Sequence, residues 1–483
     1  MSLDFSFRSG SNPERGGGTP PFRITILGDF GGCAPEAEGR RRPDPRPVDC
    51  DNFEQEFARM QVTLDLPPGN AGDGGIKLRF QRLDDFHPDR LIDEVEPLAR
   101  FARLRTRLLN PATAAEAEKE SAELLKAGAA PPDPAPAGST ESTEGMLARL
   151  LGETAAEQYT ASSGGIVDRF IRQVVGPNVP GTPPSPARLV AHAETELSAR
   201  LRALLHRPEF QALEAAWRGL DFLIRNVSEE VKLYAINCSK AELATAVTAG
   251  EEDPAGSAVY KPLEKIRPGI ILGLYTFGPQ DSAVLAGIAR LVRACQSAFV
   301  AAASPPLVGC TSFDVQPDPD DWSPGHPDEA EKFGALRRMP VAAHLGLAAP
   351  RFLLRQPYGK SSDPIEAFPF EEMPANPDHE SYLWGNPALL CGYLLATAAA
   401  AEVLDPEFQE GGEVDGLPLH RFTSDGETRV KPCAEAWLNE RAAEAILSHG
   451  IMPVLSVRGR DAVQLPALQS FSEPPGPLVI RVE

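Results

Sequence analysis

Short runs of apolar residues, some alternating with polar ones, predict β-strands along most of the chain. Phe22–Leu27 reads FRITIL, and Gly75–Leu83 alternates Ile, Leu and Phe with Lys, Arg and Gln, as a half-buried strand does. Further strands are predicted at Val231–Asn237, Gly269–Tyr275, Ala298–Ala302, Leu345–Leu354 and Ile451–Val457.

Apolar residues three and four positions apart predict helices between these strands. One long apolar stripe begins after Asp84 and Asp85 and continues to Leu108. Other helices are expected at Phe53–Met60, Ile166–Val175, Leu197–Leu205, Phe210–Ile224, Lys240–Ala249, Asp281–Arg293, Asn386–Val403 and Glu435–His449. Strands that alternate with helices are typical of an α/β fold with a parallel or mixed sheet.

Two of these helices allow predictions for single residues. Asp51 is the expected N-cap of Phe53–Met60. On Phe210–Ile224, Trp217 shares an apolar face with Leu213 and Leu220, so we expect Trp217 in the core rather than in a binding site.

Composition divides the chain into segments. Residues 1–20 are polar and rich in Gly, which predicts a flexible arm, and residues 127–145 (AGAAPPDPAPAGSTESTEG) have the Pro/Ala/Ser-rich composition of a linker. Between and after them lie residues 21–126, the first segment, and residues 146–483, the second segment. The sequence therefore predicts two fused segments joined by a linker.

The charge of the chain excludes some classes of partner. The formal net charge is −21, which disfavours nucleic acid and anionic membranes because both attract Lys and Arg. Residues 1–126 carry 18 basic and 22 acidic residues, whereas the remainder carries 29 and 46. No apolar run is long enough for a membrane span and no signal peptide is recognisable, so we expect a cytoplasmic protein without direct membrane insertion. The 7 Cys contain no C-x-x-C pair and are expected to be free, mostly buried thiols.

Candidate catalytic and ligand-binding patterns are weak. Asp29–Gly31 is a DFG triplet, but no other kinase motif accompanies it. The loop Asp318–Glu329 offers carboxylates and His326 to a cation, but its spacing does not fit an EF-hand, so a solvated acidic loop is favoured over a metal-dependent enzyme. The His spacing fits no zinc motif and no Ser lies in G-x-S-x-G. We expect no enzyme, no cofactor and no metal site.

Four parts of the first segment, in order, resemble the small sheath subunit of type VI secretion systems. They are Phe22–Gly32 (FRITILGDFGG), Val48–Phe57 (VDCDNFEQEF), Ile76–Arg90 (IKLRFQRLDDFHPDR) and Val95–Leu104 (VEPLARFARL). The residues that carry this resemblance are Asp29, Phe30, Asn52, Phe53, Asp85 and Phe86.

The second segment resembles the large sheath subunit of the same systems. The matching motifs include HRPEFQALEAAWRGLDFLIR at His206–Arg225, FVAAASP at Phe299–Pro305, PRFLLRQPYG at Pro350–Gly359 and YLWGN at Tyr382–Asn386. The motif residues expected to define the fold are Trp217, Arg218, Gly219, Pro350, Arg351, Phe352, Trp384, Gly385 and Asn386.

This resemblance implies a structural protein with the mixed-sheet fold of sheath subunits. It implies assembly in the cytoplasm with copies of itself or other sheath subunits around a tube protein. It also implies a baseplate and an ATP-driven disassembly chaperone as further partners. The linker would make the association of the two segments intramolecular.

Large subunits of the family continue well past the motif at Gln469–Ser470, whereas 13 residues follow Ser470 here. This difference favours an alternative, a sheath-like adaptor, cap or baseplate-associated protein that does not polymerise. Leu478–Val482 (LVIRV) is expected to be a strand that could pair with the sheet edge of a neighbour.

Overall fold

The computed structural model describes residues 21–32, 43–68, 75–128, 186–249, 253–323, 325, 327–373, 377–424 and 426–482. These residues form two compact units. The body comprises the described residues up to Ala99 and from Ser198 onward, and the helical unit comprises those in Arg100–Leu197.

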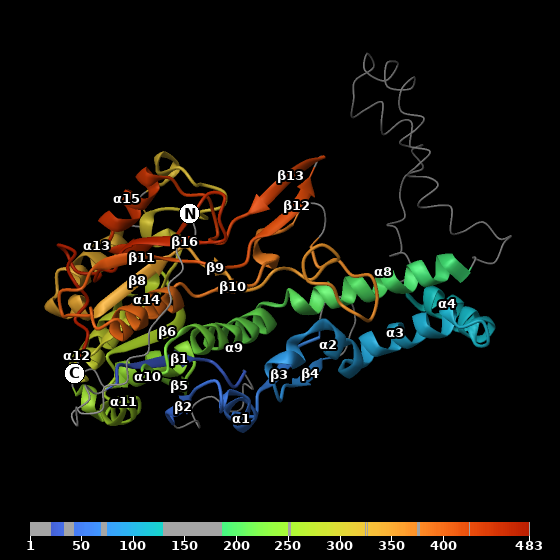
Figure 1. Ribbon diagram of the computed structural model, residues 1–483, viewed down its shortest axis with the longest axis horizontal. Coiled ribbons are helices and arrows are strands. Elements are labelled where there is room, and N and C mark those ends of the chain that lie inside the picture. Colours follow the sequence, from blue (N-terminus) through green and yellow to red (C-terminus); the bar gives the residue numbers. More distant parts are fainter. Residues whose placement is uncertain are drawn as a thin grey trace, which may run out of the picture. The chain divides into compact units, whose positions relative to one another are not determined.

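A seven-stranded sheet is the centre of the body (Figure 1). Its order is β14 (Ile451–Pro453), β8 (Leu345–Ala349), β7 (Ala298–Ala303), β6 (Ile270–Phe277), β1 (Arg23–Gly28), β5 (Lys232–Asn237) and β2 (Arg46–Val48). Neighbouring strands are parallel except β5 and β2, which are antiparallel, so the predicted α/β fold with a mixed sheet is confirmed.

The position of β1 is the main feature of this sheet. Along its whole length β1 pairs with β5, from Arg23 opposite Lys232 to Gly28 opposite Asn237, and its other edge pairs with β6. A strand of the first segment therefore lies between two strands of the second, and both segments contribute to one sheet.

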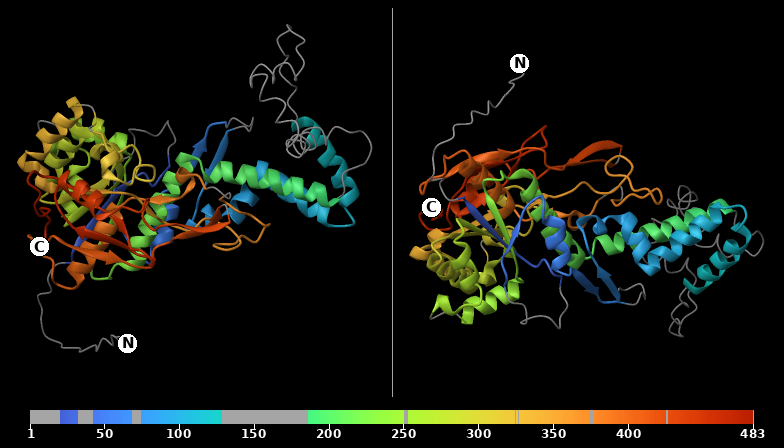
Figure 2. Two further views of the ribbon diagram at one scale, coloured as in Figure 1. Left: turned by 90° about the horizontal axis from the view of Figure 1, so that it is seen from above. Right: turned by 60° about the horizontal axis from the view of Figure 1, so that its bottom comes forward.

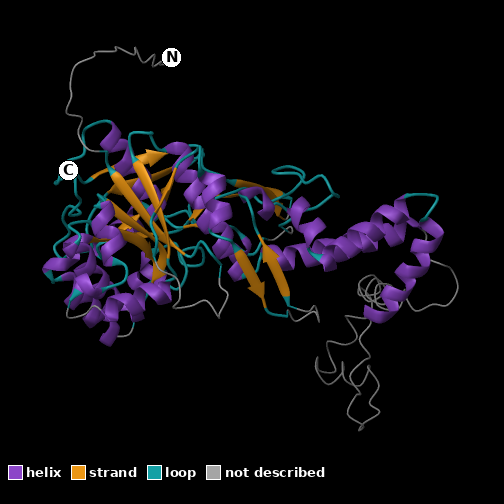
Figure 3. Ribbon diagram, turned by 90° about the horizontal axis from the view of Figure 1, so that it is seen from below, coloured by secondary structure: helices purple, strands orange, loops and turns teal. Residues whose placement is uncertain are grey.

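Helices cover both faces of the sheet (Figure 3). One hydrophobic core joins strand residues such as Ile271 and Phe299 to α10 (Lys240–Ala249), α11 (Tyr260–Ile266), α12 (Ser282–Ala294), α13 (Pro327–Arg337) and α15 (Glu440–Ser448). On the other face, α14 (Ala388–Ala400) packs against β6 and against α9 (Pro208–Asn226). These two helices come close, because a Cβ on Gly219 of α9 would lie 2.6 Å from Cδ1 of Leu389.

Smaller elements of the body surround this layered core. The first segment adds α1 (Phe53–Arg59), the hairpin of β3 (Thr63–Leu66) and β4 (Ile76–Arg79), a 3₁₀ turn at Leu83–Phe86 and α2 (Pro88–Glu94); Figure 2 shows the blue hairpin outside the large sheet. The second segment adds the pairs β9 (Phe352–Leu353) with β10 (Trp384–Gly385) and β12 (His420–Ser424) with β13 (Glu427–Lys431), and the three-stranded sheet of β11 (Glu410–Val414), β16 (Val463–Ala467) and β15 (Leu455–Ser456).

The helical unit contains α4 (Ala114–Gly128) and most of α3 (Glu96–Leu109) and α8 (Pro186–Leu205). Its small core consists of Leu104, Leu108, Ala117, Leu189 and Ala193. An ion pair of 2.7 Å between Nε of Arg105 and Oε1 of Glu194 adds a polar contact between α3 and α8.

Several predicted boundaries are wrong for identifiable reasons. The long helix expected up to Leu108 is interrupted at Val95, because Pro97 has no N–H for a continuous helix and α3 restarts with this proline in its first turn. The strand expected over Leu345–Leu354 divides at Pro350 into β8 and β9, since proline cannot donate a hydrogen bond within a sheet. The N-cap of α1 is Asn52, one residue after the predicted Asp51.

Leu478–Val482 is not a strand. Leu478 and Ile480 are buried, and the backbone N–H groups of Val479 and Arg481 donate to the carbonyls of Ala343 and Gly269. This segment is thus packed on its own chain.

Other predictions fall wholly or partly outside the described residues. The helix at Ile166–Val175, the arm at residues 1–20 and all but the first two residues of the linker at 127–145 lie there. Among the described helices, none has the length and apolar character to cross a membrane. Of the described thiols, Cys50 is exposed and Cys238, Cys295, Cys310, Cys391 and Cys433 are buried and unpaired, as predicted.

Candidate functional site

An aromatic cluster joins the two segments within the body. We define it as Phe30, Phe53, Phe57, Phe80, Phe86, Phe210 and Trp217. Trp217 on α9 is fully buried, and its ring centroid lies 5.3 Å from Phe30, 5.8 Å from Phe53 and 4.1 Å from Phe57. Its Nε1–H donates to the carbonyl oxygen of Phe30 at 2.9 Å. The prediction that Trp217 is a core residue is confirmed.

Polar residues of the first segment position these aromatic rings. Asn52 Oδ1 accepts from the N–H of Asp49 at 3.0 Å and its Nδ2 donates to the carbonyl of Pro47 at 3.2 Å, which holds the chain where α1 begins at Phe53. The carboxylate of Asp85, nearly buried, accepts from the N–H of Gln81 at 2.7 Å and of Arg82 at 3.1 Å. These bonds fix the turn that carries Phe86 into the cluster.

The carboxyl end of β1 is held by a residue that the sequence reasoning did not single out. Asn237, at the end of β5, accepts with Oδ1 from the N–H groups of Phe30 at 3.0 Å and Gly31 at 3.2 Å. Asp29 lies half-buried at the same strand end. The GDFGG turn therefore serves to place Phe30 against Trp217 and Asn237.

A buried ion network lies beside the cluster. Arg355 donates from Nε to Oε1 of Glu214 at 2.9 Å and from Nη1 to Oε2 of Glu372 at 2.7 Å. Arg218 donates from Nε to the same Glu214 oxygen at 2.7 Å and from Nη2 to the hydroxyl of Tyr358 at 3.1 Å. Burial alone would raise the pKa of Glu372. The charge of Arg355 and the hydrogen bonds to the carboxylate have the larger, opposite effect and lower this pKa to about 2. Glu372 therefore stays ionised in the folded protein.

The loop that carries Arg355 and Glu372 also contacts the first segment. Asp89, near the start of α2, accepts from the N–H of Glu366 at 3.0 Å and of Ala367 at 2.9 Å. The ring of His87 lies edge-on to Tyr358, with centroids 5.1 Å apart. The network thus links α9, the loop and the first segment. Sequence reasoning predicted Arg218 but missed Glu214, Arg355 and Glu372, although Glu214 and Arg355 lie in motifs that it quoted.

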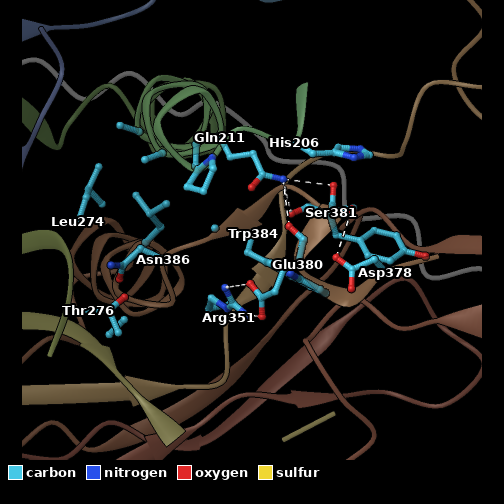
Figure 4. Close-up of a pocket in the computed structure, with 18 residues that line it drawn as sticks. His206, Gln211, Leu274, Thr276, Arg351, Asp378, Glu380, Ser381, Trp384 and Asn386 are labelled. Atoms are coloured by element: carbon cyan, nitrogen blue, oxygen red, sulfur yellow. Dashed lines mark hydrogen bonds and ion pairs between the residues drawn. The ribbon is translucent and has the colours of Figure 1, made fainter. Parts of the chain in front are cut away.

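Four of the remaining predicted residues meet at a pocket of about 570 Å³ beside the carboxyl ends of β6 and β7 (Figure 4). Arg351, Trp384, Gly385 and Asn386 line it, whereas the ring of Phe352 packs on Phe222 of α9 with centroids 5.9 Å apart. Several side chains that line the pocket form hydrogen bonds that connect neighbouring elements of the fold. Asn386 donates from Nδ2 to the carbonyl of Tyr275 and accepts from the N–H of Ala388, both at 3.0 Å, so it ties the start of α14, whose N-cap is Pro387, to β6.

Arg351 is the centre of a second ion network at this pocket. It donates to Glu380 at 3.0 and 3.1 Å and also bonds Glu435, whose Oε1 lies 2.9 Å from Nε2 of His379. Burial raises the pKa of Glu435, but His379 and Arg351 lower it to about 2. One oxygen or nitrogen each of His379, Glu380 and Glu435 lie within 4.8 Å of one another, as metal ligands would. The guanidinium of Arg351 already lies between both carboxylates, so this group fits an ion pair network better than a cation.

The acidic loop at 318–329 is partly neutralised in the structure. Asp318 accepts from the N–H of Asp320 at 3.1 Å and caps a 3₁₀ turn. The pKa of Asp320 is lowered by a hydrogen bond and ion pair with Arg441. His326 lies outside the described residues, and Asp328 and Glu329 begin α13.

Known protein families match both segments of the chain. The family model of VipB (EvpB/VC_A0108, tail sheath N-terminal domain) matches residues 187–472, and that of the type VI secretion system protein VipA (VC_A0107 or Hcp2) matches residues 19–128. The type VI secretion system sheath protein TssC1 of Pseudomonas aeruginosa is 30% identical over 315 residues, which are 59% of this chain and 61% of that relative. The chain thus spans about three-fifths of the relative's length. The chain belongs to the VipB tail-sheath family of type VI secretion systems, with a VipA segment fused ahead of it in the same polypeptide.

Proposed function

We propose that this protein is a structural subunit of a type VI secretion contractile sheath and that it assembles with like subunits around a tube. The observation that carries this proposal is the place of β1 between β5 and β6. Removing β1 would break the central sheet into two parts, so the VipA and VipB segments act as one building block. The domain boundaries at 21–126, 127–145 and 146–483, with an arm at 1–20, are part of the proposal.

The chemistry of the junction supports a structural role. Beside the aromatic cluster Arg355 forms ion pairs with Glu214 and Glu372, and at the 570 Å³ pocket Arg351 forms ion pairs with Glu380 and Glu435. Charged side chains that are held in ion pairs rigidify a packed body and are poorly suited to proton transfer. We therefore propose that the subunit is not an enzyme and needs no cofactor. As the family implies, we propose that assembly takes place in the cytoplasm. A baseplate and a disassembly chaperone are the further partners that it implies.

The fusion itself would favour assembly of the block. Two separate subunits must meet by diffusion, whereas a covalent linker keeps the two segments at roughly millimolar effective concentration. Each block would then enter the sheath with its two segments in equal numbers.

Electron microscopy of the purified full chain, alone and with a tube protein, tests the proposal. We expect tubular polymers whose formation the tube protein promotes, and a pelleting assay should recover chain and tube protein together. A chain that stays monomeric with and without the tube protein at all concentrations would instead support the non-polymerising adaptor or cap.

A further inference from the structure

The hairpin of β12 and β13 borders an exposed apolar surface. Val430 is 39% exposed and Trp437 is 38% exposed, and both line a hollow of about 370 Å³. Val315, 75% exposed, follows Asp314, whose carboxylate is 2.6 Å from Nζ of Lys431 on the same hollow. Aromatic and apolar residues around a hollow are typical of the centre of a protein interface.

Basic side chains surround this apolar centre. Arg421 is exposed and is the cross-strand partner of Val430, and Arg429 lines the hollow. Lys431, Asp314 and Glu435 also line it, but the charge of Lys431 is paired with Asp314 and that of Glu435 with Arg351. Arg458 lies over the ring of Trp437, 5.9 Å from its centroid. We call the surface formed by Val430, Trp437, Arg421, Arg429 and Arg458 the basic surface. It stands out on a chain whose formal net charge is −21.

A second exposed surface has the opposite charge. Val403, after the end of α14, is 57% exposed. The adjacent residues Glu402 and Leu404 line a hollow of about 620 Å³ together with Glu229 and Glu230, and Lys232 is the basic residue in its lining. Asp405 and Glu407 follow and are exposed. We call the surface formed by Val403, Glu402, Glu229, Glu230, Asp405 and Glu407 the acidic surface.

The two surfaces lie far apart on the body. The acidic surface includes the hollow lined by Val482, at the chain end marked C in Figure 1, and the hairpin of β12 and β13 lies toward the other side of the body. Two different, separated surfaces that fit each other join copies head to tail, and repetition of such a contact gives a ring or a helical polymer.

We propose that the basic surface of one copy docks on the acidic surface of a second copy. Each surface offers exposed valine, a hollow and charges opposite to those of the other. Two bodies of the same negative charge repel one another in general, so opposed local charges would select this contact and orient the approach. The inference rests on the proposed function, because it names the contact by which like subunits would assemble.

Charge reversal on each surface tests the contact. Arg421→Glu alters the basic surface, and Glu407→Arg alters the acidic one. Lys332→Glu and Glu331→Arg are matched controls, since both residues are exposed on α13 outside the two surfaces. Sedimentation velocity should show self-association weakened at least about tenfold by either surface variant and unchanged by either control. Unchanged melting temperatures would establish that all four variants fold.

Mixing the two surface variants gives the sharper result. Arg421→Glu keeps its acidic surface and Glu407→Arg keeps its basic surface, so an equal mixture should form heterodimers that cannot grow. If the wild type assembles and both surface variants assemble equally well, this inference is overturned and the proposed function still stands. Absence of any self-association by the wild type, both alone and with the tube protein, would overturn both. A mixture in which neither variant binds the other would also refute the head-to-tail contact.

Discussion

Trp217 donates its indole N–H to the backbone carbonyl of Phe30 across 2.9 Å, and the two residues belong to different segments of the chain. The rings also contact edge to face, with centroids 5.3 Å apart. Phe30 lies two residues after the end of β1, so this bond fixes the end of the strand that completes the central sheet. One side chain of the VipB segment thus determines where the VipA segment leaves the sheet.

Trp217→Ala should lower the free energy of unfolding by about 3–5 kcal/mol, because it opens a cavity in the aromatic cluster and leaves the Phe30 carbonyl without its donor. Urea denaturation followed by circular dichroism measures the loss. Trp437→Ala is the matched control, since Trp437 is 38% exposed and its removal should change stability by less than about 0.5 kcal/mol. Equal effects of the two substitutions would remove Trp217 from the structural role assigned to it.

Gly219→Ala should destabilise the protein although alanine favours helix. A Cβ at Gly219 would lie 2.6 Å from Cδ1 of Leu389, which is fully buried, so α9 and α14 must separate or Leu389 must leave its rotamer, at about 1–3 kcal/mol. The control is Gly334→Ala on α13, where the nearest atom to a Cβ is Nη1 of Arg338 at 3.4 Å. This second substitution should raise the melting temperature, because it removes backbone entropy from the unfolded chain. A stabilised Gly219→Ala variant would contradict the close packing of the two helices.

The buried carboxylate of Glu372 should make stability depend on pH in the acid range. Its pKa is about 2 in the folded protein against an ordinary 4.5, so its contribution is fully present above pH 4.5 and is lost as the pH falls toward 2. Glu372→Gln should reduce this acid dependence and, by leaving Arg355 short of a partner, cost about 3–5 kcal/mol at neutral pH.

Urea midpoints at neutral pH and at several values below pH 4.5 check this expectation. Glu366→Gln is the control, because Glu366 is exposed and its side chain has no part in the network. If wild type and Glu372→Gln lost stability in parallel as the pH falls, Glu372 would not be the residue responsible.

The sequence could predict the elements of the fold but not the order of strands. FRITIL is a clear strand signal, yet nothing local in Phe22–Leu27 specifies that β5 and β6, more than 200 positions later, are its neighbours. The hairpin of β12 and β13 was missed because both strands are largely polar. The Asp-Gly pair at residues 425–426 is a hairpin-turn signal that could have revealed it.

Within the junction, local patterns predicted apolar residues better than charged ones. The helical spacing of Leu213, Trp217 and Leu220 indicates one buried face. Glu214 lies beside that face and would ordinarily be assigned to solvent, but it is fully buried because Arg355, 141 positions away, pairs with it. A partner at that distance cannot be identified from the spacing of charges along one chain.

The buried thiols should react slowly in the folded protein. Burial raises the pKa of Cys238, Cys295 and Cys391 to about 12 and of Cys310 and Cys433 to about 11, so few thiolates form at mildly alkaline pH. Of the described thiols, Cys50 is exposed and should be alkylated first. Timed labelling with iodoacetamide, read by peptide mass spectrometry, distinguishes each site. Labelling of Cys391 as fast as that of Cys50 would show that the core around α14 opens readily.

Cutting the linker should not release the VipA segment. A specific protease site inserted between residues 129 and 145 would divide the chain after α4, yet β1 would remain paired on both edges and Trp217 would still hold Phe30. We expect the two fragments to elute together in size-exclusion chromatography and to separate only in concentrated urea. The same cut in the Trp217→Ala variant should release the first fragment at a lower urea concentration, because that variant has lost the centre of the aromatic cluster. A first fragment that elutes alone under native conditions would mean that the tether, and not the shared sheet, holds the two segments together.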